Sequence, residues 1–184
     1  MVRVYISNFD IENIECQTMV LGFFEDERPL RGLTGLVDWK MNGLLSNMII
    51  KGFCDGHKGE KILIATEGRL PFKKILLMGL GKTEAFDLED LADTGKDMAE
   101  TAYKIGSTQL ATQVPGPESR GADYSKRVER FINGVLNWLS SFDDENRPEI
   151  DLTLMDREER FDDIMAGLYK SKSFHKNKKI LSFT

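Results

Sequence analysis

The sequence predicts an α/β protein, a three-layer α/β/α sandwich in which helices cover both faces of a mixed sheet of about six or seven strands. Two observations support this fold class. Short apolar runs typical of buried strands alternate with longer segments whose apolar residues recur every three or four positions, as in amphipathic helices. The clearest run, Ile75 to Met78, ends in Gly79-Leu80-Gly81. We interpret it as a strand at the centre of the sheet, ending in a tight loop where α/β sheets tend to bind ligands.

The first third of the chain is predicted to hold two strands and one long helix. Apolar and polar residues alternate over residues 2–7, and residues 18–24 form a more continuous apolar run that stops before Pro29. Over residues 33–50 the apolar residues recur at helical spacings, which predicts an amphipathic helix of roughly five turns. Gly52 follows as its stop signal.

The middle of the chain is predicted to form two strands and a second helix. A glycine-rich loop over residues 52–60 leads into an apolar strand at residues 61–66. A turn at residues 67–69 then connects this strand to the clearest apolar run. Asp87 is the predicted N-cap of the next helix, and Gly106 ends that helix.

The last part of the chain continues the alternation. The predicted segments are a weaker strand at residues 108–114, a helix at 123–140, a strand at 150–154, a helix at 157–169 and a short apolar run at 180–183. Right-handed crossovers between strands in this order place helices on both faces of the sheet.

Composition and charge exclude several classes of protein. With 184 residues, the chain is predicted to form a single domain over residues 1–184. A hydrophobic fraction of 41%, a charged fraction of 30% and no run of about 18 apolar residues indicate a globular protein without a membrane span. A net charge of -5 argues against a nucleic-acid partner, which would need a basic face. The N-terminus shows no cleavable signal pattern, and two cysteines are too few for a disulfide framework, so we expect a cytoplasmic protein.

Four segments, in this order, carry a resemblance to a known family: VLGFFEDERPL, GFCDGHKGEKILIAT, KKILLMGLGKTEAFDLEDL and MAGLYKSKSF. The most specific features are the acidic residues before Pro29, the GLGK tetrapeptide at positions 79–82 and the Tyr-Lys pair at positions 169–170. Their order and spacing resemble the N-terminal domain of the leucyl (cytosol) aminopeptidases over residues 18–176. The resemblance implies a macro-domain-like three-layer fold, in agreement with the pattern of strands and helices.

In the family that the chain resembles, the peptidase chemistry belongs to a larger C-terminal domain, whose acidic residues and lysine hold two divalent metal ions. We expect this chain to lack that domain, so no catalytic residue, metal ligand or cofactor is carried over. The acidic runs at residues 25–27 and 143–145 are interpreted as solvated loops. Residues 67–70 (EGRL) repeat four letters of the family's metal-binding signature, but the preceding aspartate is missing, since Ala65-Thr66 stands there. A lone glutamate cannot assemble a two-metal site, so this segment is predicted to be an exposed turn.

The two glycine-rich loops form the candidate ligand site. The candidate binding residues are Gly79, Leu80, Gly81 and Lys82, together with Gly56 and Gly59. As a dinucleotide fingerprint the first loop lacks its third glycine, where Glu84 stands, and as a P-loop it lacks its first glycine, where Leu76 stands. The resemblance implies that a macro-type fold would place an ADP-ribose-binding loop here. The alternative, which we favour, is that the glycines only permit a tight turn.

Three smaller features are weighed in the same way. Cys54 lies three residues before His57, so a thiolate–imidazole pair is one interpretation, and a chance pairing in a loop is the one we favour. The lysines from position 170 onward could contact a phosphate backbone, but such a run on an acidic protein usually forms a solubilising surface. Trp39 and Trp138 lie on predicted helices and are expected to be partly buried.

Three functions remain, and we rank them in this order. The first is a stand-alone, non-catalytic homologue of the aminopeptidase N-terminal domain, acting as an interaction or regulatory module with a protein partner or a second copy of itself. The second is a subunit of a split metallo-aminopeptidase whose catalytic chain is separate. The third is a macro-type binder of ADP-ribose or a related nucleotide through the glycine-rich loops.

Overall fold

The computed structural model describes residues 1–117, 123–174 and 181–183. The strands of this part of the chain are β1 (Val2–Ser7), β2 (Thr18–Phe23), β3 (Lys61–Ala65), β4 (Lys74–Gly79), β5 (Gln109–Thr112), β6 (Ile150–Met155) and β7 (Leu181–Phe183). They form one seven-stranded sheet in the order β3-β4-β2-β5-β6-β1-β7. Neighbouring strands are parallel except β3 and β4, which are antiparallel, so the predicted mixed sheet is confirmed.

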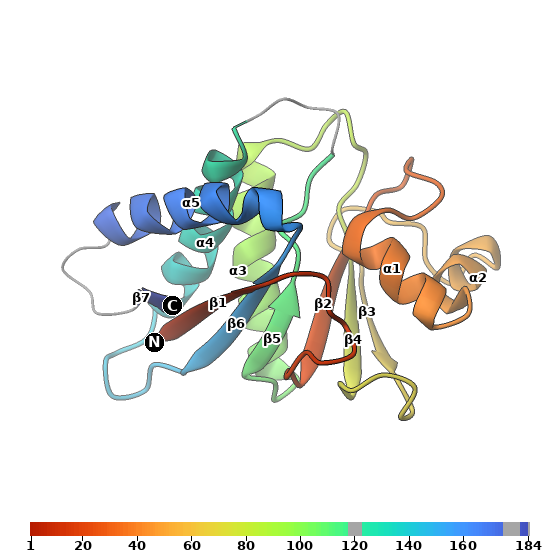
Figure 1. Cartoon of the computed structure of the whole chain (residues 1–184), viewed down its shortest axis with the longest axis horizontal. Coiled ribbons are helices and arrows are strands. Elements are labelled where there is room, and N and C mark those ends of the chain that lie inside the picture. The colour runs from red at the N-terminus through yellow and green to blue at the C-terminus, as the bar shows by residue number, and fades with distance from the viewer. Residues whose placement is uncertain (118–122, 175–180, 184) are drawn as a thin grey trace.

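Helices cover both faces of this sheet (Figure 1). They are α1 (Gly32–Lys40), α2 (Leu44–Ile50), α3 (Leu88–Lys104), α4 (Tyr124–Leu139) and α5 (Phe161–Phe174), with a 3-10 turn, η1 (Glu158–Arg160), before α5. Alternate strand residues face two separate cores, as the period of a strand requires. In β2, Val20 packs with α3, α4 and α5, whereas Met19 and Leu21 pack with α1 and α2. The predicted three-layer sandwich is therefore confirmed.

The segment predicted as one long helix forms two short helices, α1 and α2. Asn42 and Gly43 between them have positive φ angles, 54° and 75°, which no helix can continue through. The Asp38 carboxylate then accepts hydrogen bonds from the N–H groups of Leu45 (2.8 Å) and Ser46 (3.1 Å) at the start of α2. The apolar spacing runs on across the break, so the prediction of a single helix was wrong.

Strand β4 is buried along almost its whole length, as predicted, but it is not the central strand. It lies second from the β3 edge, and β2 and β5 lie further inside the sheet. β3 is its antiparallel neighbour, joined through a turn in which Glu67 and Gly68 have φ angles of 53° and 78°. The segment EGRL thus lies in a turn between two strands, as predicted.

The predicted N-cap of α3 is present, whereas only one of the two tryptophans is buried. The Asp87 carboxylate accepts the N–H groups of Glu89 (2.8 Å) and Asp90 (3.0 Å), so the predicted N-cap is confirmed. Trp138 is 7% exposed, but Trp39 is 71% exposed, so the expected partial burial of Trp39 was wrong. Trp39 lies on the solvent side of α1, with the Lys40 ammonium 5.4 Å from its ring.

Strands β2 and β5 are parallel neighbours whose following segments lead to opposite faces of the sheet. The chain after β2 reaches α1 on one face, and the chain after β5 reaches α4 on the other (Figure 1). In open α/β sheets, ligands bind in the crevice beyond the carboxyl ends of such a strand pair.

Candidate functional site

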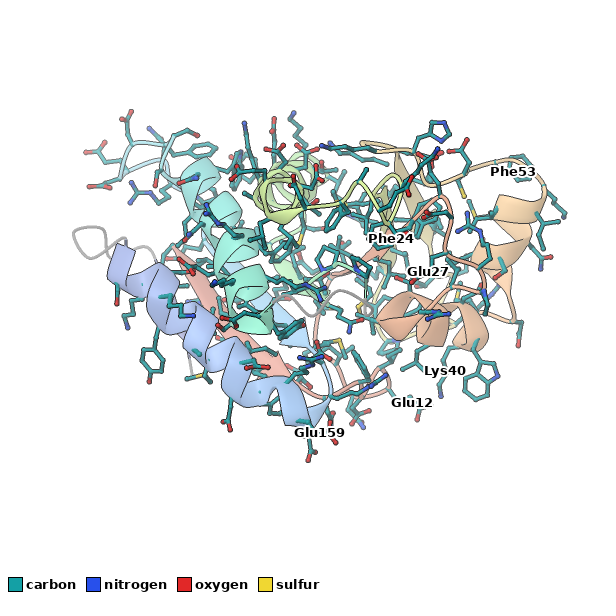
Figure 2. All side chains as sticks on the ribbon, turned by 90° about the horizontal axis from the view of Figure 1, so that it is seen from above. Glu12, Phe24, Glu27, Lys40, Phe53 and Glu159 are labelled. Atoms are coloured by element: carbon teal, nitrogen blue, oxygen red, sulfur yellow. The ribbon has the colours of Figure 1, made fainter. Side chains whose placement is uncertain are left out.

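A cavity of about 270 Å³ lies at the carboxyl ends of β2, β5 and β6. The first turn of α1, the first turn of α4 and the segment around η1 complete its walls. Figure 2 views the molecule from above, and in it two lining residues, Phe24 and Glu27, lie beside the start of α1. The cavity is therefore at the strand ends where the topology predicts binding.

The charged residues that line the cavity are four arginines and two carboxylates: Arg31, Arg127, Arg157, Arg160, Glu27 and Asp156. Positive charge is thus in excess, although the whole chain is acidic. A guanidinium presents its donors in a planar fork that matches carboxylate and phosphate oxygens. The lining favours an anionic ligand.

The start of α1 adds to this positive potential. Its first turn carries no acidic residue, and the N-cap residue, Arg31, makes no side-chain cap hydrogen bond. The Leu33 N–H donates to Gln113 Oε1 at 2.9 Å, which ties the helix start to the end of β5. Gly32 permits this approach, since its φ is +55° and a Cβ there would lie 2.5 Å from the same oxygen. A helix N-terminus attracts anions through its dipole and its N–H groups.

A hydrogen-bonded network crosses the floor of the cavity. Asp156, which is 5% exposed, accepts from Gln113 Nε2 at 3.4 Å and from the Arg157 N–H at 2.8 Å. The Tyr124 hydroxyl donates to the other Asp156 oxygen. Burial, and then the neighbouring Asp156 charge, raise the pKa of Tyr124, so this hydroxyl keeps its proton. The network joins α1, β5, β6 and α4 and fixes their relative positions.

Two of the arginines pack against the ring of Tyr124. The guanidinium carbons of Arg127 and Arg160 lie 5.1 Å and 4.8 Å from the ring centroid. Arg127 Nη2 also donates to the carbonyl oxygen of Pro115 at 2.7 Å. These contacts hold both guanidinium groups at the cavity, so that they need little reorganisation to meet an anion.

The two glycine-rich loops singled out from the sequence do lie together. The Gly81 N–H donates to the Gly56 carbonyl at 2.8 Å, and the Gly59 N–H donates to the Gly79 carbonyl at 3.2 Å. These amide groups are therefore paired within the loops. Gly79 has no room for a side chain, because a Cβ would lie 2.1 Å from the His57 carbonyl oxygen.

Three of the six predicted ligand residues line cavities. Leu80 lines the arginine-rich cavity, and Leu80, Gly59 and Gly79 line a second cavity of about 190 Å³ beside α3. Gly56, Gly81 and Lys82 line neither of these two cavities. A ligand role for the six residues stays a prediction.

The other sequence candidates do not form a site in the part of the chain that the structure describes. His57 Nδ1 lies 2.5 Å from Asp55 Oδ1, and Cys54 is buried among apolar residues. Burial raises the pKa of the Cys54 thiol, which is the opposite of what a thiolate nucleophile needs. Within the described ranges no group of three or more His, Cys, Asp or Glu side chains could hold a metal ion. Residues 175–180, with His175 and three of the candidate lysines, lie outside the described residues.

The arginines of the cavity were missed by the sequence interpretation. A signal was available for Arg157, which follows the predicted strand at 150–154 by three positions and stands next to Asp156. Polar residues just after a parallel strand are candidates for a binding site.

No helix among the described residues is long and apolar enough to cross a membrane.

Comparisons with known proteins agree with this fold. A family model described as "Cytosol aminopeptidase family, N-terminal domain" matches residues 20–147. The probable cytosol aminopeptidase of Cyanothece sp. is 29% identical over 132 residues, which are 70% of this chain and 27% of that protein. The chain thus spans about a quarter of the length of this curated relative.

Solved structures show the same relationship. A mutant of tomato leucine aminopeptidase matches with a TM-score of 0.67 at 18% identity, over 91% of this chain and 36% of that one. The Trypanosoma brucei macrodomain in complex with ADP-ribose matches with a TM-score of 0.68 at 12% identity, over 88% and 67%. These likenesses establish a macro-domain-like fold. The family model matches residues 20–147, which is more than half of this chain. The chain therefore belongs to the cytosol aminopeptidase family and carries the N-terminal domain of that family.

Proposed function

We propose that the chain binds an anionic nucleotide-like molecule, with ADP-ribose as the first ligand to test, in the arginine-lined cavity. The observation that carries this proposal is the convergence of four arginines on one cavity of about 270 Å³ at the carboxyl ends of parallel strands. This changes the order of the functions ranked from the sequence, and it moves the proposed site away from the glycine-rich loops.

The chemistry of the cavity supports a diphosphate. Four guanidinium groups face two carboxylates, and one of these carboxylates, Asp156, already accepts three hydrogen bonds. A diphosphate supplies the negative charge and the oxygen pairs that guanidinium forks bind. The start of α1, with no acidic residue in its first turn, would add N–H donors to the same group. A related fold, the Trypanosoma brucei macrodomain, has been solved with ADP-ribose bound, which makes that molecule a sensible probe.

Titration calorimetry with ADP-ribose tests the proposal. We expect binding by the wild-type chain and a loss of affinity of about tenfold or more in Arg157→Met, since a charge-assisted contact is removed. Arg130→Met is the matched control: Arg130 is a half-exposed arginine of α4 near Glu89, outside the residues lining the two cavities. No heat with ADP-ribose or ADP at millimolar concentration would exclude this function.

Protein interaction is the second candidate, and exposed apolar side chains favour it. Trp39, Ile50 and Phe53 are 71%, 81% and 71% exposed, all within one short stretch of the chain. We propose that this stretch supports a regulatory contact or the assembly of a split aminopeptidase. Purification of the wild-type chain and of Trp39→Ser from the native cell tests this second proposal. Recovery of a peptidase subunit with the wild type alone supports assembly, and recovery with neither opposes assembly.

A cytoplasmic location and a single domain over residues 1–184 stay predictions.

A further inference from the structure

We infer that Lys170, on α5, is a positioning residue for the cavity: it holds the first turn of α4, which carries Tyr124 and Arg127, without touching the ligand. This inference rests on the proposed function for its ligand. It gives a role to Lys170 of the Tyr-Lys pair at positions 169–170, neither of which lines the cavity.

Lys170 reaches from α5 to the start of α4. Its ammonium nitrogen lies 2.8 Å from Ser125 Oγ and 4.0 Å from Asp123 Oδ2. The Ser125 hydroxyl, in turn, donates to Asp123 Oδ1 at 2.6 Å. Ser125 is 5% exposed and the Lys170 side chain 45%, so the ammonium group reaches from the surface to a buried hydroxyl.

Asp123 is the N-cap of α4, and it accepts the Ser125 N–H at 3.0 Å. The Ser125 hydroxyl, and beyond it the Lys170 charge, lower the pKa of Asp123, which keeps this cap ionised. α5 approaches closely enough because Gly167 has no side chain: a Cβ there would lie 2.6 Å from the Ser125 carbonyl oxygen. Gly167 and Lys170, one turn apart, thus seat α5 on the first turn of α4.

Two residues of that turn, Tyr124 and Arg127, line the cavity. Tyr124 follows Asp123 directly, and its hydroxyl donates to Asp156, the residue after β6. Arg127, one turn further, packs on the Tyr124 ring. Lys170 is not among the residues that line the cavity, so its effect on a ligand passes through Tyr124 and Arg127.

Binding of ADP-ribose by Lys170→Met and Lys170→Arg, measured by calorimetry on the full chain, tests the inference. We expect Lys170→Met to weaken binding about fivefold, the effect of one ordinary hydrogen bond, because Lys170 acts on the ligand only indirectly. Lys170→Arg should restore most of the affinity, because it keeps the charge and the donor. Lys126→Met is the control. It removes an equal charge from an exposed lysine in the first turn of α4, outside the residues that line the cavity. Equal affinities of wild type and Lys170→Met would overturn the inference.

A double-mutant cycle separates positioning from general loss of stability. Lys170→Met should cost less affinity in an Arg127→Met background than in the wild type, because part of its effect passes through that side chain. In an Arg31→Met background its effect should persist in full, since Arg31 belongs to α1. Additive effects in both backgrounds would show that Lys170 is not coupled to Arg127 and would refute the positioning role.

Hydrogen exchange of the ligand-free chain keeps the inference testable if ADP-ribose does not bind at all. Lys170→Met should speed exchange of the amides of residues 124–127 and leave those of α3 unchanged. If the wild type fails to bind ADP-ribose but this exchange changes as expected, the proposed ligand is wrong and the seating of α4 by Lys170 stands. Unchanged exchange at residues 124–127 refutes the seating itself.

Discussion

Tyr124→Phe removes the hydroxyl that donates to Asp156 and keeps the ring on which Arg127 and Arg160 pack. Asp156 is 5% exposed, so water does not freely replace the lost donor. Leaving a buried charged acceptor one donor short costs about 1–3 kcal/mol. Asp156 keeps donors at 2.8 Å and 3.4 Å, which favours the lower part of that range, about 1–2 kcal/mol.

Urea unfolding measures this loss. With a denaturant slope of about 1–3 kcal/mol per molar, the midpoint of Tyr124→Phe should fall by roughly 0.3–2 M. Tyr103→Phe is the matched control: Tyr103 is 46% exposed, so the same deletion there should change the free energy of unfolding by less than about 0.5 kcal/mol. If the two variants lose equal stability, the Tyr124–Asp156 hydrogen bond contributes nothing and the network does not hold the four elements together.

The same variant has a pH signature. Burial, followed by the Asp156 charge, raises the folded pKa of Tyr124 above its ordinary value of 10.0. A group whose pKa is raised on folding contributes stability below its unfolded pKa, and that contribution is lost as the pH rises toward the folded pKa. Wild type should therefore lose stability more steeply than Tyr124→Phe above about pH 10. Parallel curves in alkaline urea titrations would contradict the shift.

Three further variants test the frame around the cavity. Gly134→Ala places a Cβ 1.9 Å from the Ala92 carbonyl oxygen, where α4 packs on α3. The cost of overpacking, about 1–3 kcal/mol, exceeds the gain in helix propensity of about 1 kcal/mol, so the melting temperature should fall. An unchanged melting temperature would mean that the two helices move apart at no cost. Asp87→Ala removes the N-cap of α3 and should cost about 1 kcal/mol in urea unfolding, with no loss arguing against the cap. The pKa of Asp26 is lowered chiefly by the hydrogen bond from the backbone N–H of Thr83, so the stability that ionised Asp26 contributes is present above its unfolded pKa and is lost as the pH falls. In Asp26→Asn, the melting temperature should therefore decline less steeply than in the wild type below about pH 4. An equally steep decline would refute this role of Asp26.

The features that the sequence predicted well are those set by neighbouring residues. The Asp87 cap and the turn at Glu67 and Gly68 depend on contacts within a few positions, and β4 is recognised by its continuous apolar run; all three are present. The break between α1 and α2 was missed, because the Asp38 carboxylate reaches seven residues forward while the apolar spacing continues unbroken.

The cavity depends on contacts between distant segments. Arg31, Arg127 and Arg157 come from three separate parts of the chain and meet only because β2, β5 and β6 are adjacent in the sheet. Strand order is not encoded in apolar periodicity, so of these three arginines only Arg157, just after a predicted strand, carried a signal in the sequence. The glycine-rich loops drew attention instead because their unusual composition is visible locally, although their amides are largely paired with each other.

The placement of β1 has a consequence for how the chain assembles. Val2 pairs with Ile150 on one side and with Leu181 on the other, so both neighbours of the first strand come from the last part of the chain. Strands β2 to β5, by contrast, find all their mutual pairings within residues 18–112. During synthesis, that half of the sheet can form while the first strand still waits for partners not yet made. Contacts of such large sequence separation are slow to close, so we expect docking of the N-terminal strand to be the late event that completes folding.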